Sequence, residues 1–367
     1  MAEPARVPVA ARAARAVLIA LAIVAAALTA CKDPAPRPVP SSPPARRAFY
    51  FWRTTFQLSA TERAALTDLG AARLYVRVFD VEWRAADDGP ATMGPIIATA
   101  PPPDLTGVEI VPVVYLRNDV FSHLPAARVD EVARWAWHEV EQRTAALGVT
   151  PHELQLDCDW TDSTRDRFFA FVTALDAIAR PRAVALSATI RLHQIKYRER
   201  TGVPPVARGM LMFYNMGRFS PDPEARAIFD AEAARRYLAR IDDYPLPLDA
   251  ALPIWSWTLH LRDDVIEGLL QSTDPDELAD LDFVRATGPD RYVVTRNAFL
   301  HGTLLREADV LKIEVTGPGE SLAAATMLAA HLAASPRPRT VALFDLSERN
   351  LHRHGLDDLD RVYRAIR

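Results

Sequence analysis

Cysteine, glycine and surplus positive charge are scarce in this sequence, and each scarcity excludes a class of protein. Two cysteines in 367 residues exclude a scaffold held together by disulfides. A formal net charge of −4 provides no basic surplus to neutralise phosphates, so we expect no nucleic-acid partner. The 14 glycines form no phosphate-binding loop, and neither zinc-ligand spacing nor a nucleophile elbow is present. We therefore expect no metal and no cofactor.

Hydrophobic residues make up 49% of the chain, as in a globular protein with a sizeable core. The apolar run long enough to meet a membrane, Ala16 to Leu28, has thirteen residues and follows three arginines. A transmembrane helix needs about 20 such residues, whereas the shorter run is typical of a signal-peptide core. We predict a signal peptide over residues 1–30, with an uncleaved anchor as the alternative.

The apolar run ends in Leu28-Thr29-Ala30-Cys31, which resembles the bacterial lipobox. The resemblance implies that Cys31 is acylated and becomes the first residue of the mature protein, and several acyl chains anchor a protein firmly. Lys32 stands where an aspartate would signal retention in the inner membrane, so we expect the outer membrane if the host has one. The sequence thus predicts a lipid-anchored protein of the bacterial cell envelope, facing the periplasm or the exterior.

Six prolines lie in the segment that follows Cys31 and extends to residue 47. Proline at this density is incompatible with a helix or a sheet ladder and favours an extended, semi-rigid chain. We predict that residues 31–47 form a tether that holds the folded body away from the lipid. Acylation of Cys31 leaves Cys158 without a partner, so we expect a buried, inert thiol there.

Strand-like runs alternate with helical patterns from residue 48 onward. The eight runs are 48–53, 73–79, 108–116, 153–159, 184–190, 209–215, 251–257 and 341–346. Most are followed by apolar residues at helical spacing, as in Val129 to Leu147, where Gly148 provides a stop. Eight such units predict an α/β fold, a (β/α)8 TIM barrel over residues 48–367. A two-lobed solute-binding protein is the alternative.

The connection between the seventh and eighth strands is unusually long. It contains helical patterns near 263–270 and 319–334, with strand-like pieces at 291–297 and 309–315 between them. A structureless loop of that length is uncommon in a compact domain. We therefore predict an insertion over residues 258–318 beside the mouth of the barrel.

Barrel enzymes work at the C-terminal ends of their strands, which makes the fourth run the first place to look. Its alternation gives an apolar face and a polar face, the latter formed by Gln155, Asp157 and Asp159. Helices cover the outside of a barrel, so we expect the polar face to line the lumen. Two carboxylates about 7 Å apart along a strand need cations, hydrogen bonds or a shared proton. They form either a working site or a structural polar network.

The residues Asp157-x-Asp159-Trp160 resemble the latter part of the D-x-x-D-x-D-x-E signature of family 18 glycoside hydrolases, the chitinases. The M-F-Y-N run that ends at Asn215 is similar to the M-x-Y-[DN] element of the same family. In chitinases the substrate's own N-acetyl group is the nucleophile. The resemblance implies that Asp159 holds this group with help from Tyr214 and Asn215, so these three and Asp157 are catalytic candidates.

The sequence departs from the chitinase signature at two positions. Thr161 occupies the place of the catalytic acid, and Leu154 replaces the leading aspartate. The D-C-D-W-T, T-I-R-L-H-Q and G-M-L-M-F-Y-N-M runs also look like an uncharacterised bacterial lipoprotein group with a glycosidase-like barrel, over about residues 47–366. A hydrolase of this kind would need a relocated acid. Glu82 and Asp162 are the first choices, and Asp80 after the second strand and Asp345 and Glu348 on or after the eighth are further candidates.

Arginines recur near the ends of the first, second, third and fifth strands. They are Arg53, Arg77, Arg117 and Arg191. We expect some of them to surround Asp157 and Asp159, where they would either clamp an anionic saccharide or form structural ion pairs.

Aromatic side chains gather at the same predicted rim. They are Trp52, Tyr115, Trp160, Tyr214, Trp255 and Trp257. Flat rings suit the C–H faces of sugars, so the cluster favours a ligand cleft over core packing. His193 follows the fifth strand, either as an acid or base or as a simple hydrogen-bonding group.

These observations leave two functions open for a protein that we expect to be monomeric. One is an envelope hydrolase that cleaves a glycan with Asp159, Tyr214 and a relocated acid. The other is a non-catalytic receptor for a glycan or an anionic ligand, or an envelope-assembly component, that uses the same cleft.

Overall fold

The computed structural model describes most of the chain beyond the predicted tether. The described residues are 43–99, 105–271, 273, 275–332 and 338–366. The predicted signal peptide, Cys31 and most of the predicted tether lie outside them. The described residues belong to one compact unit. Among the residues described, no helix is both long enough and apolar enough to cross a membrane.

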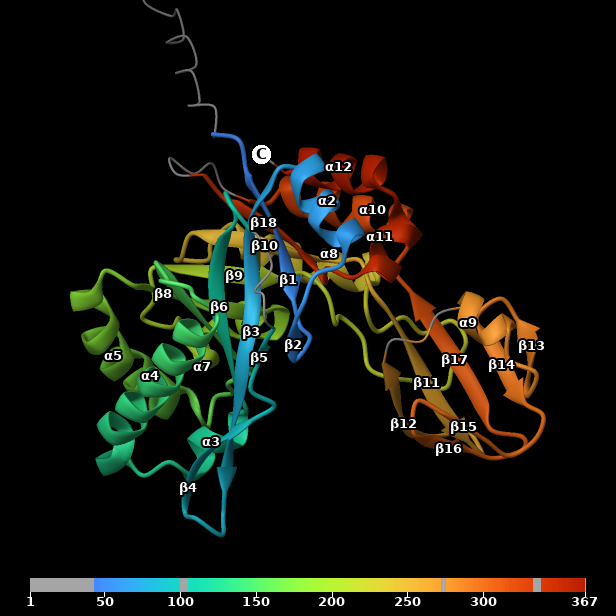
Figure 1. Ribbon diagram of the computed structural model, residues 1–367, viewed down its shortest axis with the longest axis horizontal. Helices are drawn as coiled ribbons and strands as arrows, with labels where there is room; N and C mark the ends of the chain where they lie inside the picture. The colour runs from blue at the N-terminus through green and yellow to red at the C-terminus, as the bar shows by residue number, and fades with distance from the viewer. Residues whose placement is uncertain (1–42, 100–104, 272, 274, 333–337, 367) are drawn as a thin grey trace, which may run out of the picture. The chain divides into compact units, whose positions relative to one another are not determined.

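Eight parallel strands close into a barrel, which confirms the predicted fold class (Figure 1). They are β1 (Arg46–Phe51), β3 (Ala71–Arg84), β6 (Glu109–Leu116), β7 (Glu153–Cys158), β8 (Ala185–Arg191), β9 (Arg208–Met212), β10 (Leu248–Pro253) and β18 (Thr340–Phe344). Each strand pairs with the next in this order, and β1 pairs with both β3 and β18, which closes the ring.

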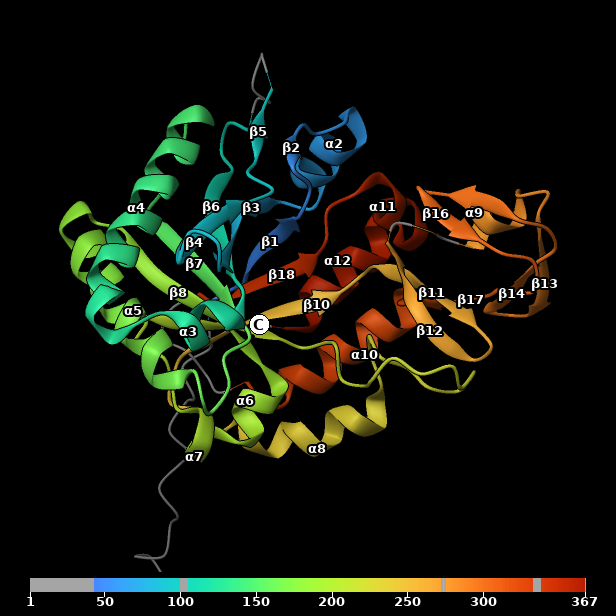
Figure 2. The ribbon, with the colours of Figure 1, turned by 90° about the horizontal axis from the view of Figure 1, so that it is seen from below.

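Helices surround the barrel, with α4 and α5 on one flank and α8 and α10 on another (Figure 2). The helices are α2 (Ala60–Asp68), α3 (Asn118–His123), α4 (Val129–Ala146), α5 (Arg165–Ala179), α6 (Leu192–Lys196), α7 (Arg198–Thr201), α8 (Ala231–Ile241), α10 (Pro318–Ala329), α11 (Glu348–His354) and α12 (Leu356–Ala365), with 3-10 turns η1 (Ala126–Arg128) and η2 (Arg180–Arg182). Local sequence sets their ends: Ser59 and Glu62 form a capping box that starts α2.

The second barrel unit departs from the alternation of strand and helix. In the described part of the β3–β6 connection, the chain forms the short strands β4 (Gly89–Met93) and β5 (Ile97–Ala98). Strand β4 pairs antiparallel with the long end of β3, and β5 pairs with β2 (Thr55–Phe56). The extended β3 hairpin therefore occupies a place that a helix takes in most other units.

Alternation along the strands separates two apolar layers. Leu154, Leu156 and Cys158 of β7 pack in the layer between sheet and helices, as the period of two predicts. Opposite faces point into the lumen, where Tyr50 packs in a second cluster with residues of β3, β6 and β9. Gln155 lies in the lumen and accepts a hydrogen bond of 2.5 Å from the Tyr50 hydroxyl. The predicted faces of the fourth strand are therefore correct from Leu154 to Cys158, where β7 ends.

The β10–β18 connection contains an antiparallel sheet with its own apolar cluster. Its elements are β11 (Ser256–Arg262), β12 (Val265–Gln271), α9 (Pro275–Ala279), β13 (Val284–Gly288), β14 (Arg291–Val294), β15 (Ala298–Leu300), β16 (Thr303–Leu305) and β17 (Val310–Val315). The predicted single strand 251–257 is wrong in extent, because β10 ends at Pro253 and Ser256 begins β11 of the inserted sheet. Trp255 and Trp257 therefore lie on either side of the point where the chain leaves the barrel.

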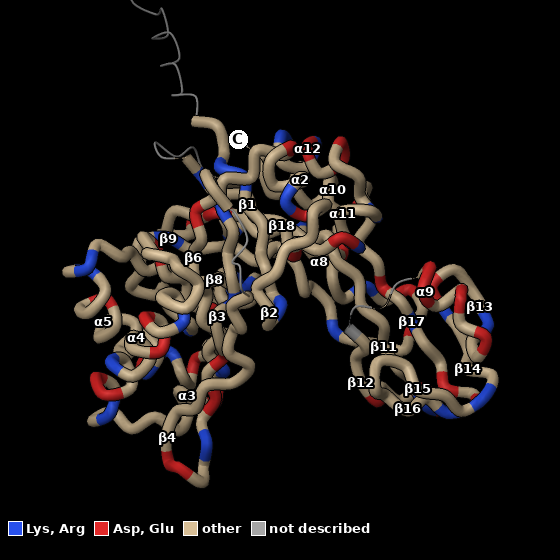
Figure 3. The backbone as a smooth tube through the Cα atoms, viewed as in Figure 1, with Lys and Arg blue, Asp and Glu red and all other residues tan. Residues whose placement is uncertain are grey.

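Basic and acidic residues are interspersed along the outer helices, as α4 and α5 show in Figure 3. Several pair within one helix: Arg143 binds Glu139 at 3.0 Å, and Arg180 binds Asp176. Exposed pairs of this kind contribute little to stability, so the core layers hold the barrel together.

Candidate functional site

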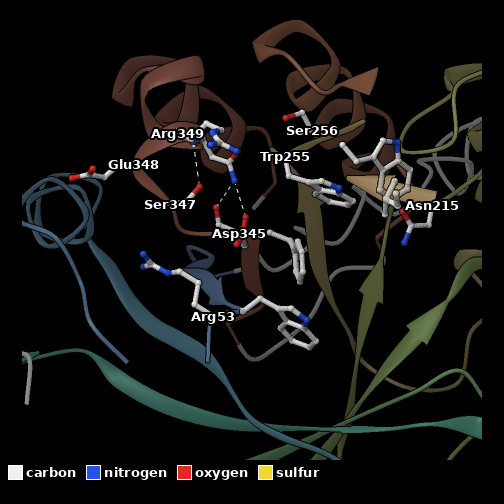
Figure 4. A pocket seen from close by; sticks show the side chains of 13 residues that line it. Arg53, Asn215, Trp255, Ser256, Asp345, Ser347, Glu348 and Arg349 are labelled. Carbon is white, nitrogen blue, oxygen red and sulfur yellow. Dashed lines mark hydrogen bonds between the residues drawn. The ribbon is translucent and has the colours of Figure 1, made fainter. Parts of the chain in front are cut away.

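A cavity of about 680 Å³ opens at the C-terminal ends of the barrel strands (Figure 4). Trp52 follows β1, Asn215 follows β9, Trp255 follows β10 and Asp345 follows β18. Six sequence-predicted residues line it: Trp52, Arg53, Asn215, Trp255, Trp257 and Asp345. The lining also includes Glu348, a further candidate acid of the sequence. The remaining lining residues, which sequence reasoning missed, are Ser256, Leu269, Phe344, Ser347, Arg349 and Asn350. For the last three, the signal in the sequence was their position just after the eighth strand.

Aromatic rings form a continuous wall in this cavity. Phe344 lies between Trp52 and Trp255, with ring centroids 5.3 Å and 5.1 Å away. Trp255 also contacts Tyr214 edge to face at 4.7 Å and Trp257 at 6.1 Å. Contacts of this kind hold the ring planes in place, so the wall is formed before any ligand arrives.

Asp345 places a carboxyl group beside the aromatic wall. The side-chain amide of Asn350 donates to Asp345 Oδ1 at 2.7 Å and to its backbone oxygen at 2.9 Å. Asn350 is in turn positioned by the Ser347 hydroxyl, which caps α11 and accepts from the Asn350 backbone amide at 3.3 Å. Burial raises the pKa of Asp345 to about 6, although the charge of Arg53 opposes the shift.

Asp157 is buried on the lumen side of β7, where one of its oxygens has two partners. Its Oδ1 accepts from the Thr189 hydroxyl at 2.7 Å and from the Arg191 guanidinium at 2.9 Å. Burial, the largest single effect, would lower the pKa of Arg191, but the nearby acidic groups, Asp157 foremost among them, together raise it and the net shift is upward. Asp157 and Arg191 therefore form an ion pair inside the barrel mouth, and neither lines the cavity.

Of the four arginines that the sequence offers as partners of the two aspartates, Arg191 pairs with Asp157 at 2.9 Å and the other three pair elsewhere. Each of the three has a nearer carboxylate: Arg53 binds Glu62 at 2.9 Å, Arg77 binds Asp80 at 2.6 Å, and Arg117 binds Asp119 at 3.2 Å and Glu82 at 3.4 Å. A long guanidinium side chain pairs with the closest acid on its own segment or the next, and the sequence does not show where that acid lies. Only Arg191 contacts Asp157.

Asp159 and Trp160 do not lie where strict alternation placed them. Strand β7 ends at Cys158, so the two-residue period stops there. The Asp159 side chain is 55% exposed and lies 3.3 Å from His193 Nε2. Trp160 is fully buried among the outer helices, stacks on Phe168 at 5.0 Å and donates to the Thr201 carbonyl at 2.8 Å. Trp160 is thus a core residue and not part of the cleft.

Tyr214 connects the ion pair to the cavity. It is buried, its hydroxyl contacts Met212 Sδ at 3.3 Å, and burial raises its pKa. The phenol lies within electrostatic reach of both Asp157 and Asp345. Tyr115, whose pKa is also raised by burial, is close to Asp157.

The two acids first chosen to replace the chitinase acid lie outside the cavity. Glu82 is within 3.4 Å of Arg117 and 3.9 Å of Arg84. Asp162 is half exposed and lies 3.3 Å from Arg200. Both are therefore surface ion-pair members in this structure.

A second cavity of about 460 Å³ adjoins the first and shares Asn215 and Trp257 with it. Gly217 and Phe219 of the β9–α8 connection contribute to its lining. The Phe219 ring is 45% exposed and meets Trp257 edge to face at 4.8 Å. The aromatic surface therefore continues from the first cavity into the second.

Two charged residues of the inserted sheet hold the β9–α8 connection in place. The buried ammonium of Lys312 donates to the backbone oxygens of Ser220, Asp222 and Ala225 at 3.2, 2.5 and 2.9 Å. Glu314 accepts from the backbone amide of Ile228 at 2.5 Å and from Trp257 Nε1 at 3.2 Å. The connection and the inserted sheet therefore form one wall. The described residues contain no group of three acids, histidines or cysteines arranged to hold a metal ion.

No family model and no curated protein matches the chain, but solved structures share its fold. The spore cortex-lytic enzyme SleL of Bacillus cereus is 11% identical, with a TM-score of 0.52 over 89% of this chain and 75% of that chain. The C-terminal domain of a putative chitinase from Desulfitobacterium hafniense is 10% identical, with a TM-score of 0.54 over 89% and 100%. A class V chitinase mutant from Cycas revoluta, in complex with (GlcNAc)3, is 12% identical, with a TM-score of 0.52 over 88% and 99%.

The structural likeness confirms the predicted chitinase-like barrel. At such low identity it concerns the fold alone.

Proposed function

We propose that this protein is a lipid-anchored lipoprotein of the bacterial cell envelope whose barrel binds an extracytoplasmic glycan. The observation on which the proposal depends is the preformed wall of Trp52, Phe344 and Trp255 in the main cavity. Aromatic faces bind the C–H surfaces of pyranose rings and leave the hydroxyl groups to polar neighbours. Such neighbours are present in Asn215 and Ser256, which line the same cavity.

The dimensions of the site support an oligosaccharide. The main cavity, at about 680 Å³, falls within the range of roughly 300–1,000 Å³ that is usual for small-molecule sites. The adjoining cavity of about 460 Å³ extends it past Trp257 to Phe219. A ligand of several sugar units would thus meet aromatic rings along its length. The (GlcNAc)3 in the Cycas revoluta chitinase complex makes N-acetylglucosamine oligomers the first ligands to test.

The anchor rests on the Leu28-Thr29-Ala30-Cys31 sequence and on the prolines that follow it. We expect the full chain, produced in a bacterium supplied with labelled fatty acid, to incorporate label and to fractionate with membranes. The Cys31→Ala variant should do neither. Labelling of the Cys31→Ala variant would contradict acylation at this residue.

Glycan binding is tested with the full chain in detergent on a panel of neutral and anionic oligosaccharides, including N-acetylglucosamine oligomers. We expect retention of at least one class, with tighter binding as the oligomer lengthens. Exposed Phe299 lies on β15, outside both cavities, so Phe299→Ala is a matched control that should bind as the wild type does. A complete lack of binding across the panel would overturn the proposal.

A further inference from the structure

The chitinase-like cleft lacks an acid at the position where the signature would place it. Thr161 stands there, and its hydroxyl lies 3.0 Å from Ser163 Oγ and 3.3 Å from Thr164 Oγ1. A threonine hydroxyl does not release a proton near neutral pH. A glycosidic bond held in this cleft could therefore be cleaved only with a proton donor from another strand.

Two carboxyl groups line the main cavity, and their surroundings differ. Glu348 is exposed, and hydrogen bonds from Ser59 and Thr61 lower its pKa. Asp345 is partly buried beside the aromatic wall, and one of its oxygens accepts from Asn350 at 2.7 Å. A general acid has to hold its proton near the working pH and face the bond that breaks. Asp345 lines the cavity and has a pKa raised to about 6, whereas the pKa of Glu348 is lowered.

We propose that Asp345, on the eighth strand, is the general acid of this cleft and that the protein hydrolyses the glycan it binds. This inference rests on the proposed glycan-binding function. The Asp345 O–H bond breaks as its proton bonds to the glycosidic oxygen, and the bond from that oxygen to the anomeric carbon breaks. A water molecule then adds to the anomeric carbon and returns a proton to the Asp345 carboxylate. One water is consumed for each bond cleaved.

Charged groups around Asp345 set the pH range of this step. Burial is the largest effect and raises the pKa of Asp345, and Glu62 on α2 raises it further. Arg53 after β1 and the hydrogen bond from Asn350 lower it, and the pKa lies at about 6. The other ionisable groups that line the cavity or lie within electrostatic reach are Tyr214, Glu348 and Arg349. We therefore expect cleavage to be fastest in mildly acidic solution and to fall as the pH rises through about 6.

The test compares the full-length wild type with Asp345→Asn, in both glycan retention and the appearance of new reducing ends. The amide can still accept the Asn350 hydrogen bond, so we expect retention within threefold and cleavage at least 100-fold slower. Asp166→Asn makes the same chemical change at an exposed position on α5 and should cleave as the wild type does. Glu82→Gln and Asp162→Asn test the rival acids and should also cleave normally.

Each outcome bears on a different part of the proposal. Wild type that binds no glycan overturns the glycan-binding function itself. Wild type that binds but produces no reducing ends at any pH from 4 to 8 overturns the role of Asp345 and leaves a non-catalytic receptor. Cleavage that survives in Asp345→Asn, or that is lost in Glu82→Gln or Asp162→Asn, assigns the acid to another residue. An alkaline limb near pH 6 that disappears with Asp345→Asn supports the assignment.

Discussion

Two aspartates near the C-terminal ends of barrel strands differ in their partners. Asp157 on β7 and Asp345 after β18 lie on strands four places apart in a ring of eight, so they face each other across the barrel. Asp157 accepts from Thr189 and Arg191, whereas Asp345 has Asn350 and an aromatic wall. A cation stabilises the charged form and burial the neutral form. Their surroundings therefore assign a structural role to Asp157 and a proton-donating role to Asp345.

The largest expected effect on stability comes from removing the charge of Arg191, the cation that pairs with Asp157. Arg191→Met leaves Asp157 buried without its charge partner, and breaking a buried pair in this way costs about 3–5 kcal/mol. We expect a loss of that size in the free energy of unfolding, measured in urea. Adding Asp157→Asn to Arg191→Met should restore part of it. A loss below about 1 kcal/mol would mean that the pair is not structural.

The stability that Asp345 contributes after β18 should depend on pH. The folded-state pKa of Asp345 is raised from 3.8 to about 6, so its contribution to stability is complete below about pH 4 and is lost as the pH rises through about 6. Asparagine does not titrate. The wild type should therefore lose about 2–3 kcal/mol relative to Asp345→Asn between pH 4 and pH 7. Burial also raises the pKa of Asp249 to about 6, but Asp249 titrates in both proteins, so its contribution cancels when the wild type is compared with Asp345→Asn. A difference that is constant with pH would contradict the shift.

The tryptophans near the two aspartates also differ in role: one lines the main cavity and the other belongs to the core. Trp255 lines the main cavity, so Trp255→Ala should weaken glycan binding about tenfold, or about 1.4 kcal/mol. Trp160 is buried among the outer helices, so Trp160→Phe should lower stability and leave the affinity unchanged. Isothermal titration and urea unfolding separate the two effects. Weaker binding by Trp160→Phe would place the cleft on the β7 side.

The smallest effect is expected at Asp159. Its side chain is 55% exposed and pairs with His193 at 3.3 Å, and exposed pairs contribute little. Asp159→Asn should change the free energy of unfolding by less than about 0.5 kcal/mol and the glycan affinity by less than about twofold. A larger loss of affinity would restore the role that the chitinase resemblance implies for Asp159.

The parts of the fold that depend on periodicity were predictable from the sequence. Alternation located the barrel strands and the two faces of β7, because one face packs on helices and the other fills the lumen. Alternation failed at Asp159 and Trp160, because side chains alternate between faces only within a strand and β7 ends at Cys158. It also merged β10 with β11, since the apolar run continues past Pro253 although the barrel strand does not.

The candidate site was only partly predictable. Aromatic residues at strand ends identified Trp52 and Trp255 as cavity residues, and Asp345 was found by its place after the eighth strand. The partners of the arginines were not predictable, because a flexible guanidinium reaches acids that are distant in sequence. Asn350 was missed for a related reason: its contact with Asp345 depends on where α11 begins.

The Lys312 ammonium has a consequence for how the cleft can change over evolutionary time. It recognises only main-chain oxygens of the β9–α8 connection, and every amino acid supplies such an oxygen. Side chains at positions such as Arg218 and Phe219 can therefore be exchanged while the backbone beneath them keeps its path. Related proteins could diversify their choice of glycan at this rim without rebuilding the wall that supports it.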